Sequence, residues 1–183
     1  MATVKGALSA ALALAVAGGL AACSDADPGE GATPGEATGT ATQDVDPMDT
    51  SERANLSNRE VSERFIEVFY NQNRLVDGFE AWVHPDYIQH DPNSPTGRDA
   101  TIEVLAAHMD RNPQMTHDVK RVIYGDEGPE GTLVAVHYHF KRAPEDRGSA
   151  VVDIYRVKDG YLVEHWDVIQ PVPENALNEN TMF

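Results

Sequence analysis

The chain has 183 residues, and its 14 basic and 30 acidic side chains give a formal net charge of −16. This length allows one ordinary domain with an appendage and excludes two full domains. The acidic balance argues against a nucleic-acid partner, because phosphate backbones are repelled. A single cysteine excludes both a disulfide framework and a cysteine-rich zinc site.

The first 22 residues are expected to form a signal peptide. Lys5 is their only charged residue, and the largely apolar run 7–22 is too short and too rich in alanine to span a bilayer comfortably. The run ends in Leu-Ala-Ala-Cys23, which resembles a bacterial lipobox, whose cysteine becomes the lipidated first residue of the mature protein. The resemblance implies a chain anchored through Cys23 to the extracytoplasmic face of the cell membrane. An ordinary signal peptide, with Cys23 incidental, is the alternative.

Residues 23–55 are rich in Gly, Pro, Ala, Thr and acids, and Val45 and Met48 are the only large apolar residues after Cys23. Such a segment buries too little apolar surface to offset its ordering entropy. We therefore predict a disordered acidic tether over 23–55 and one folded domain over 56–183.

Helical patterns come first in the domain. A capping-box sequence at 57–60 begins a helix that runs to about Asn73, and a second short helix covers 75–83. Residues 87–90 are expected to be extended, and a third helix covers about 99–111. The aromatic residues of this region, Tyr70 and Tyr87 among them, are assigned to core packing.

Four strand candidates follow, at 115–124, 132–142, 149–157 and 161–169, and short turns connect them. Consecutive strands with short turns form an antiparallel meander. Helices followed by a sheet indicate an α+β domain, and helices across the concave side of a curved antiparallel sheet enclose a small-molecule pocket.

Asp153 is the strongest candidate for a pocket group. It shares a strand face with Val151, Tyr155 and Val157, so exposing Asp153 would expose three apolar side chains as well. A carboxylate on an apolar face needs a partner or a raised pKa. We therefore expect Asp153 to point inward, with Tyr155 beside it.

Histidines accompany this carboxylate. His137 and His139 share one face of their strand, and His90 precedes a proline-bounded loop from which it would reach a pocket mouth. Taken singly, each of the two strand histidines fits a structural or surface role better than a functional one.

The last strand has two distinct faces. Val163, His165 and Asp167 share one face, while Glu164 and Trp166 share the other. We favour the His165 face as the one lining the cavity, although a β-bulge would change the alternation.

Two segments, 152–168 and 87–92, resemble the SnoaL-like polyketide cyclases of the nuclear-transport-factor-2-like, or cystatin-like, superfamily. The resemblance implies a cone-shaped α+β fold with an enclosed apolar cavity, and a homodimer formed through the sheet. Cyclases of this family close a ring by intramolecular aldol condensation without a metal or an organic cofactor. An acidic residue in the penultimate strand acts as acid and base, assisted by a histidine.

Carried onto this sequence, the resemblance assigns the acid/base role to Asp153 and the assisting role to His139, with His137 as the alternative. The other pocket candidates, expected to contact substrate, are His90, His137, Tyr155, His165 and Asp167. No cofactor and no metal is expected.

Three functions stay open at this point. The first is cyclase or isomerase chemistry on a carbonyl compound, and the second is non-catalytic binding of a small apolar ligand at the cell surface. The third is a histidine-based metal site, because Gly131 followed by His137 and His139 resembles the start of a cupin motif, although Glu145 is misplaced for it.

Overall fold

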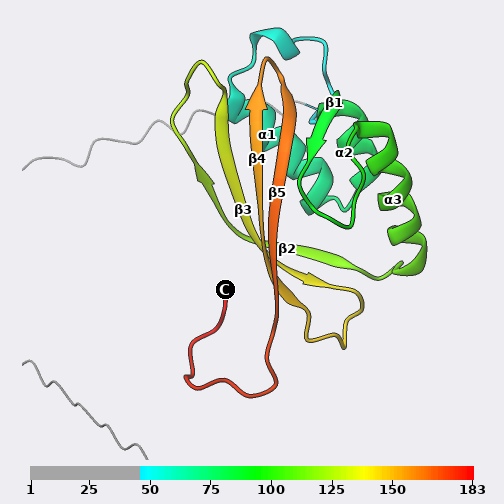
Figure 1. Ribbon diagram of the computed structural model, residues 1–183, viewed down its shortest axis with the longest axis vertical. Coiled ribbons are helices and arrows are strands. Elements are labelled where there is room, and N and C mark those ends of the chain that lie inside the picture. The colour runs from blue at the N-terminus through cyan, green and yellow to red at the C-terminus, as the bar shows by residue number, and fades with distance from the viewer. Residues whose placement is uncertain (1–45) are drawn as a thin grey trace, which may run out of the picture. The chain divides into compact units, whose positions relative to one another are not determined.

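The computed structural model describes residues 46–183 (Figure 1). The expected signal peptide, the lipidation residue Cys23 and the tether as far as residue 45 lie outside the described residues. Within 46–183, none of the helices combines the length and the apolarity needed to cross a membrane. The helical elements are η1 (Arg53–Asn55), α1 (Asn58–Ile66), η2 (Glu67–Asn71), α2 (Leu75–Trp82) and α3 (Arg98–Arg111).

The first helix begins where the sequence predicts. The backbone N–H of Glu60 donates to Ser57 Oγ (3.2 Å), and the N–H of Ser57 donates to the Glu60 carboxylate (2.8 Å), which completes the capping box. After Ile66 the helix widens into a π-helical turn, η2, closed by the N–H of Gln72 on the carbonyl of Glu67 (2.9 Å). Three consecutive residues, 68–70, are buried there.

Five strands form one sheet in the order β1-β5-β4-β3-β2. Their bounds are β1 (Val83–Gln89), β2 (Thr116–Tyr124), β3 (Thr132–Lys141), β4 (Ser149–Lys158) and β5 (Tyr161–Pro171). Strands β2 to β5 form the predicted antiparallel meander, which confirms the α+β fold. The expectation of four strands is wrong, because β1 pairs in parallel with β5.

A β-bulge sets the faces of β5. Leu162 pairs with Val157 and Glu164 with Arg156, so Val163 is an extra residue between the two pairs. Leu162 is buried in place of Val163, which corrects the predicted inward position of Val163. Beyond the bulge the alternation of β5 resumes. His165 and Asp167 then lie on the same face of the sheet as Tyr155 and Asp153 of β4.

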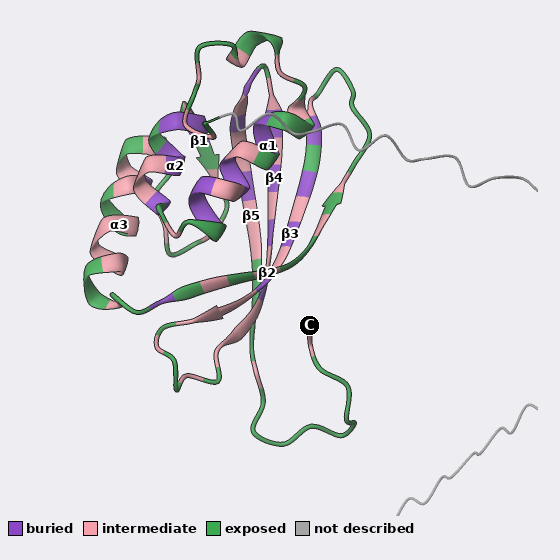
Figure 2. Ribbon diagram, turned by 180° about the vertical axis from the view of Figure 1, so that it is seen from behind, coloured by how far each residue is buried: buried purple, intermediate pink, exposed green. Residues whose placement is uncertain are grey.

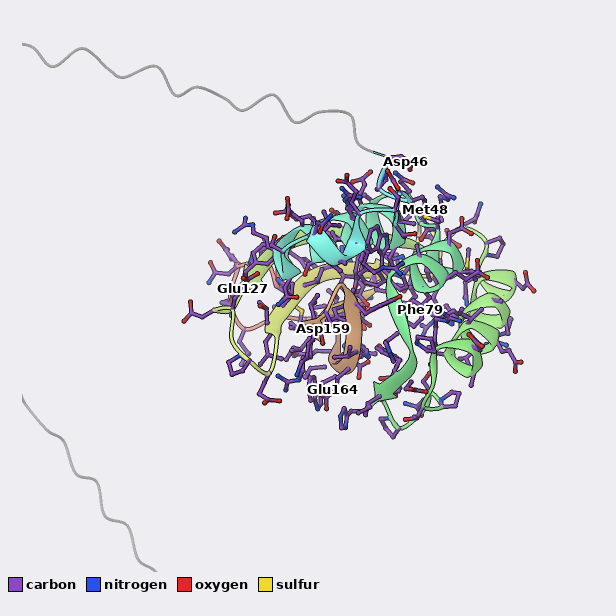
Figure 3. The ribbon with its side chains drawn as sticks, turned by 90° about the horizontal axis from the view of Figure 1, so that it is seen from above. Asp46, Met48, Phe79, Glu127, Asp159 and Glu164 are labelled. Carbon is purple, nitrogen blue, oxygen red and sulfur yellow. The ribbon has the colours of Figure 1, made fainter. Side chains whose placement is uncertain are left out.

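The helices cover the concave face of the curved sheet (Figure 1), and buried residues concentrate where helices and strands meet (Figure 2). In Figure 3, Phe79 lies on this helix-covered side. Trp82 of α2 is fully buried, and its Nε1 donates to the carbonyl of Pro47 (2.9 Å). These contacts supply the apolar burial that holds the two layers together.

The ordered domain begins earlier than the sequence predicts. Met48 packs against the core, and Asp46 and Met48 lie beside the helices (Figure 3). The guanidinium of Arg53 lies 4.2 Å from the ring centroid of Tyr161 and 5.4 Å from that of Trp82. Residues 46–55, assigned to the tether, therefore pack on the domain.

Candidate functional site

A cavity of about 330 Å³ lies between the concave face of the sheet and helices α2 and α3. Its walls are mostly apolar, and polar groups converge on it from β1, β4 and β5. Helix α3 contributes Thr101, Val104, Leu105 and His108, which recur at helical spacing on one face. The polar and titratable lining residues from the strands and the loop after β1 are Tyr87, Gln89, Asp91, Asn93, Ser94, His117, Tyr138, Ser149, Asp153, Tyr155, His165 and Asp167.

Asp153 lies at the base of this cavity and is only 6 % exposed. The Tyr70 hydroxyl donates to its Oδ2 at 2.5 Å, and the Tyr155 hydroxyl donates to the same oxygen at 3.3 Å. The two hydroxyl oxygens are 2.8 Å apart. Two phenols therefore hold one carboxylate oxygen and leave Oδ1 facing another group. The π-helical turn is what brings Tyr70 to this position.

That other group is His165. Its Nε2 lies 3.5 Å from Asp153 Oδ1, and its Nδ1 lies 2.8 Å from Gln89 Oε1. The same Gln89 oxygen accepts the backbone N–H of Asp91 at 3.0 Å, which fixes the amide orientation. An amide oxygen only accepts, so His165 Nδ1 must carry a proton.

The fixed tautomer constrains the pair. If Asp153 and neutral His165 were both unprotonated at the facing atoms, two lone pairs would oppose each other across 3.5 Å, away from water. At this separation, one proton placed between Nε2 and Oδ1 would satisfy both atoms.

The two carboxyls of the site, Asp153 and Asp167, have pKa values that are shifted in opposite directions. Burial raises the pKa of Asp153, but hydrogen bonding and charge from His165, with hydrogen bonds from Tyr70 and Tyr138, bring that pKa below its ordinary value. Of the two expectations for Asp153, a partner or a raised pKa, the structure shows the partner. Asp167 pairs directly with Asp153 across β4 and β5. Burial and the charges of Asp91 and Asp153 raise the pKa of Asp167.

Tyr87 of β1 carries an unused donor. Its side chain is fully buried against the cavity, and its hydroxyl has no hydrogen-bond partner among residues 46–183. Burial and the charges of Asp153 and Asp167 raise its pKa well above the usual range, so the hydroxyl keeps its proton. The hydroxyl oxygen is also sealed from solvent, so it is an unsatisfied donor in the wall of the cavity.

Three predicted site residues lie elsewhere. His137 and His139 lie on the opposite face of the sheet, because Val136, which precedes His137, pairs with Asp153, and adjacent residues of a strand point to opposite faces. His139 Nε2 contacts the carbonyl of Arg147 (2.9 Å), so the expected pairing of His139 with Asp153 is wrong. The substrate contact expected of His137 is wrong for the same reason of strand parity.

His90 is also outside the cavity. Its ring stacks on Trp166 with centroids 4.8 Å apart, and its Nε2 lies 2.9 Å from Glu164. Both partners belong to the outer face of β5, and Figure 3 shows Glu164 on the side away from α1. The expected position of His90 at the pocket mouth is wrong, because β1 joins the sheet and turns this side chain outward.

Sequence patterns give no site role to several of these residues. Tyr70 and Tyr87 are predicted as core, and Gln89, Asp91, His117 and Tyr138 have no predicted role. The alternation of Tyr87 and Gln89 around Ile88 was the available signal, since it is the period of a strand with one inward face. The contacts of Tyr70 depend on a π-helical turn that no sequence pattern announces.

The histidine-based metal alternative finds no ligand set in the described part of the chain. Among residues 46–183, no three His, Cys, Asp or Glu side chains lie close enough together to hold a metal ion. His137 and His139 instead stack on Phe183, at centroid distances of 5.8 and 4.2 Å.

A larger hollow of about 530 Å³ lies at the other end of the domain. It is a shallow polar groove formed by the start of α1 and the turns after β2 and β4. No buried titratable cluster lines it among the described residues, so we place the candidate site in the smaller cavity, where the buried polar groups converge.

The chain belongs to the SnoaL-like domain family, which it matches over residues 62–165, more than half of its length. That range contains the cavity network from Tyr70 to His165. Among curated proteins, none matches the sequence significantly.

Solved structures show similar folds at low identity. IdmH of Streptomyces antibioticus, a candidate polyketide cyclase, is 19% identical with a TM-score of 0.46, and the match covers 62% of this chain and 92% of that one. An NTF2-like protein of unknown function from Mesorhizobium loti is 18% identical with a TM-score of 0.49, covering 67% and 94%. A cystatin-fold protein from Novosphingobium aromaticivorans is 23% identical with a TM-score of 0.47, covering 62% and 98%.

Proposed function

We propose that the cavity binds a small carbonyl compound and catalyses cofactor-independent proton transfer of the aldol-cyclase or isomerase type. The observation that carries the proposal is the cross-strand pair Asp153 and Asp167, whose pKa values move in opposite directions beside a histidine of fixed tautomer. Two carboxyls whose pKa values are driven apart in this way divide the acid and base roles between them.

Asp167 is the base in this proposal. Its raised pKa brings it closer to the range in which a carboxylate removes a proton from the carbon next to a carbonyl. The C–H bond breaks, the proton goes to the Asp167 carboxylate, and the electron pair moves to the carbonyl oxygen as an enolate. A small shift of the Tyr87 ring, whose hydroxyl is sealed from solvent in the free protein, would let that hydroxyl donate a hydrogen bond to the enolate oxygen.

In this proposal, a proton shared by Asp153 and His165 completes the reaction. In an isomerisation, Asp167 returns its proton to a different carbon of the enolate. In an aldol closure, the enolate carbon attacks a second carbonyl, and the alkoxide that forms takes the proton held between Asp153 and His165. Proton transfer from Asp167 to that pair, directly or through water, then restores the starting state.

Hydrogen–deuterium exchange tests this proposal without knowledge of the natural substrate. A panel of cyclic ketones and 1,3-diketones is incubated with the protein in D₂O, and loss of the α-proton is followed by NMR. We expect the wild type to accelerate exchange of at least one ketone and Asp167→Asn to lose the acceleration by about 100-fold or more. His139→Asn, on the outer face, is the matched control and should keep it.

The non-catalytic alternative has its own support. The polar groups at the base of the cavity are bonded mainly to one another, and the remaining walls are mostly apolar, as in a site that only holds a ligand. Saturable ketone binding by the wild type with no acceleration of exchange would establish this alternative and contradict the catalytic proposal.

We further propose that the chain is exported and anchored through Cys23. The support is the lipobox-like sequence at the end of the apolar run, where the only cysteine stands. Metabolic labelling with an alkyne fatty acid tests it. The wild type should incorporate the label and fractionate with membranes, and Cys23→Ala should do neither. Labelling of both proteins would refute the anchor.

A homodimer through the outer face of the sheet is the third element of the proposal. Ile88, Ile123, Leu133 and Val168 expose between 43% and 65% of their surface on that face. An apolar patch of this kind is typical of an interaction surface. Sedimentation equilibrium should give a dimer for the wild type and a monomer for Leu133→Asp, and a monomeric wild type would refute it.

A further inference from the structure

His117 of β2 lines the cavity but takes no part in the Asp153 network. Its ring centroid lies 5.6 Å from that of Tyr138 and 5.3 Å from that of Phe140, and 6.0 Å from those of Tyr70 and Phe69. The imidazole is thus a polar group surrounded by aromatic side chains. Such a group needs a structural or a functional partner for each nitrogen.

One nitrogen has a structural partner. His117 Nδ1 lies 2.9 Å from Asn73 Oδ1, and Asn73 Nδ2 donates to the carbonyl of Met115 at 3.2 Å. The Met115 carbonyl only accepts, so the amide orientation is fixed and its oxygen faces His117. His117 Nδ1 therefore carries the proton, and in the neutral ring the lone pair is on Nε2.

Asn73 holds this position in an uncommon backbone conformation. Its φ is +53°, in the left-handed region that a non-glycine residue seldom adopts and that asparagine tolerates better than most. Such a conformation persists where surrounding contacts hold it and is found frequently at ligand sites. Here the conformation directs an amide at a cavity histidine.

The second nitrogen has no partner in the protein. Within residues 46–183, Nε2 of His117 makes no hydrogen bond, and it is not among the polar atoms sealed from solvent. It therefore reaches the cavity space. Burial is the main cause that lowers the pKa of His117 to about 4, opposed by the charge of Asp153. The ring is uncharged at neutral pH and acts as an acceptor.

We propose that His117 is a specificity-determining residue whose Nε2 accepts a hydrogen bond from a hydroxyl group of the ligand. The aromatic rings around it favour a flat ligand, so the preferred chemistry is a phenolic or enolic hydroxyl on a planar ring system. This inference rests on the proposed function only in requiring that the cavity binds a small molecule.

A pair of matched probes tests it. 2-Naphthol carries a hydroxyl donor, and 2-methoxynaphthalene has the same ring without one. We expect the full-length protein to bind 2-naphthol about tenfold more tightly in titration calorimetry, as one added hydrogen bond permits. His117→Phe should bind both probes with nearly equal affinity.

Asn73 supplies a second variant that keeps the backbone. Asn73→Gly retains a residue suited to positive φ and removes the amide, so the tautomer is no longer fixed. We expect the tenfold preference to shrink. Asp159→Gly is the matched control, because Asp159 has a φ of +52° in the turn between β4 and β5 and does not line the cavity. Its preference should equal that of the wild type.

Nitrogen-15 NMR of the imidazole reports the same bond directly. The free wild type should show protonated Nδ1 and unprotonated Nε2, and 2-naphthol should shift the Nε2 resonance upfield while 2-methoxynaphthalene does not. Equal affinities of the wild type for the two probes, or an undiminished preference in His117→Phe, would overturn the role of His117. Failure of both probes to bind would instead count against the cavity as a ligand site, which is the proposed function itself.

Discussion

The two faces of the sheet carry the same residue types and use them differently. On the concave face, His165 and Asp153 are 8% and 6% exposed, and each lies beside specific partners. On the convex face, His139 contacts a backbone carbonyl and stacks on Phe183 at the protein surface. The chemistry of a strand histidine in this protein is therefore decided by strand parity and not by its neighbours in sequence.

The physical cause of the difference is access to water. A polar group on the convex face exchanges a protein partner for solvent at little cost, whereas one under the helices has no such substitute. The concave face should therefore respond strongly to loss of a single partner, and the convex face weakly. The four predictions below test that contrast in order of decreasing effect.

Removal of the central carboxylate should be the most costly change. Asp153→Ala leaves the hydroxyls of Tyr70 and Tyr155 and the His165 ring without their common partner. We expect the free energy of unfolding in urea to fall by about 3–5 kcal/mol, as for other broken buried pairs. Asp118→Ala, at an exposed position of β2, is the control. Equal losses of unfolding free energy in the two variants would show that the buried Asp153 contributes no more to stability than an exposed carboxylate.

Lowering the pH should destabilise the folded protein through His117. Its pKa of about 4 in the folded chain lies below the ordinary 6.5, so between these pH values the unfolded chain binds a proton that the folded chain does not. Stability should therefore decrease as pH falls from 6.5 to 4, by about 3 kcal/mol from this group.

The comparison of unfolding curves for the wild type and His117→Phe at pH 7 and pH 4 isolates that contribution. Asp167 acts in the opposite direction, because its raised pKa favours the folded state on protonation, but it is present in both proteins. A variant with the same pH dependence as the wild type would contradict the assignment.

Loss of one phenol should have an intermediate effect. Tyr70→Phe removes the 2.5 Å hydrogen bond to Asp153 and keeps the ring packing, so we expect a loss of about 1.5–3 kcal/mol in chemical denaturation. Tyr124→Phe is the matched control, since its half-exposed side chain lies over Arg59 and its hydroxyl makes no hydrogen bond within residues 46–183. A Tyr70 variant as stable as this control would refute the role of the short bond.

The convex face should give the smallest effect. His139→Ala removes a contact with the Arg147 carbonyl and one stacking partner of Phe183, both at the surface. We expect its thermal unfolding free energy to stay within about 0.5 kcal/mol of the wild type. A loss above 2 kcal/mol would contradict the weak dependence on single partners expected of this face.

Much of the fold was readable because it depends on local signals. The capping box at 57–60 located the start of α1, and the change to a period of two located the meander. Asp153 was placed inward because Val151 and Tyr155 share its face, an argument that needs only alternation within one strand.

The errors all involve relations between distant segments. The parallel pairing of β1 with β5 joins residues such as Gln89 and His165, and no local pattern encodes it. Choosing His139 over His165 as partner of Asp153 required the register of two strand pairs, which the turns and the bulge at Val163 determine in three dimensions. Tyr70 is missed because it lies in a π-helical turn, and His117 is missed because its partner is an asparagine with a positive φ.

The π-helical turn at Glu67–Asn71 has a consequence for how this chain tolerates length changes. Each residue of an α-helix advances the side-chain direction by about 100°. Deleting one residue within this turn would let the helix rewind to ordinary spacing and rotate Tyr70 away from the carboxyl it holds, while leaving the helix itself intact. The shortened chain would then keep a regular helix and lose the hydrogen bond between Tyr70 and Asp153.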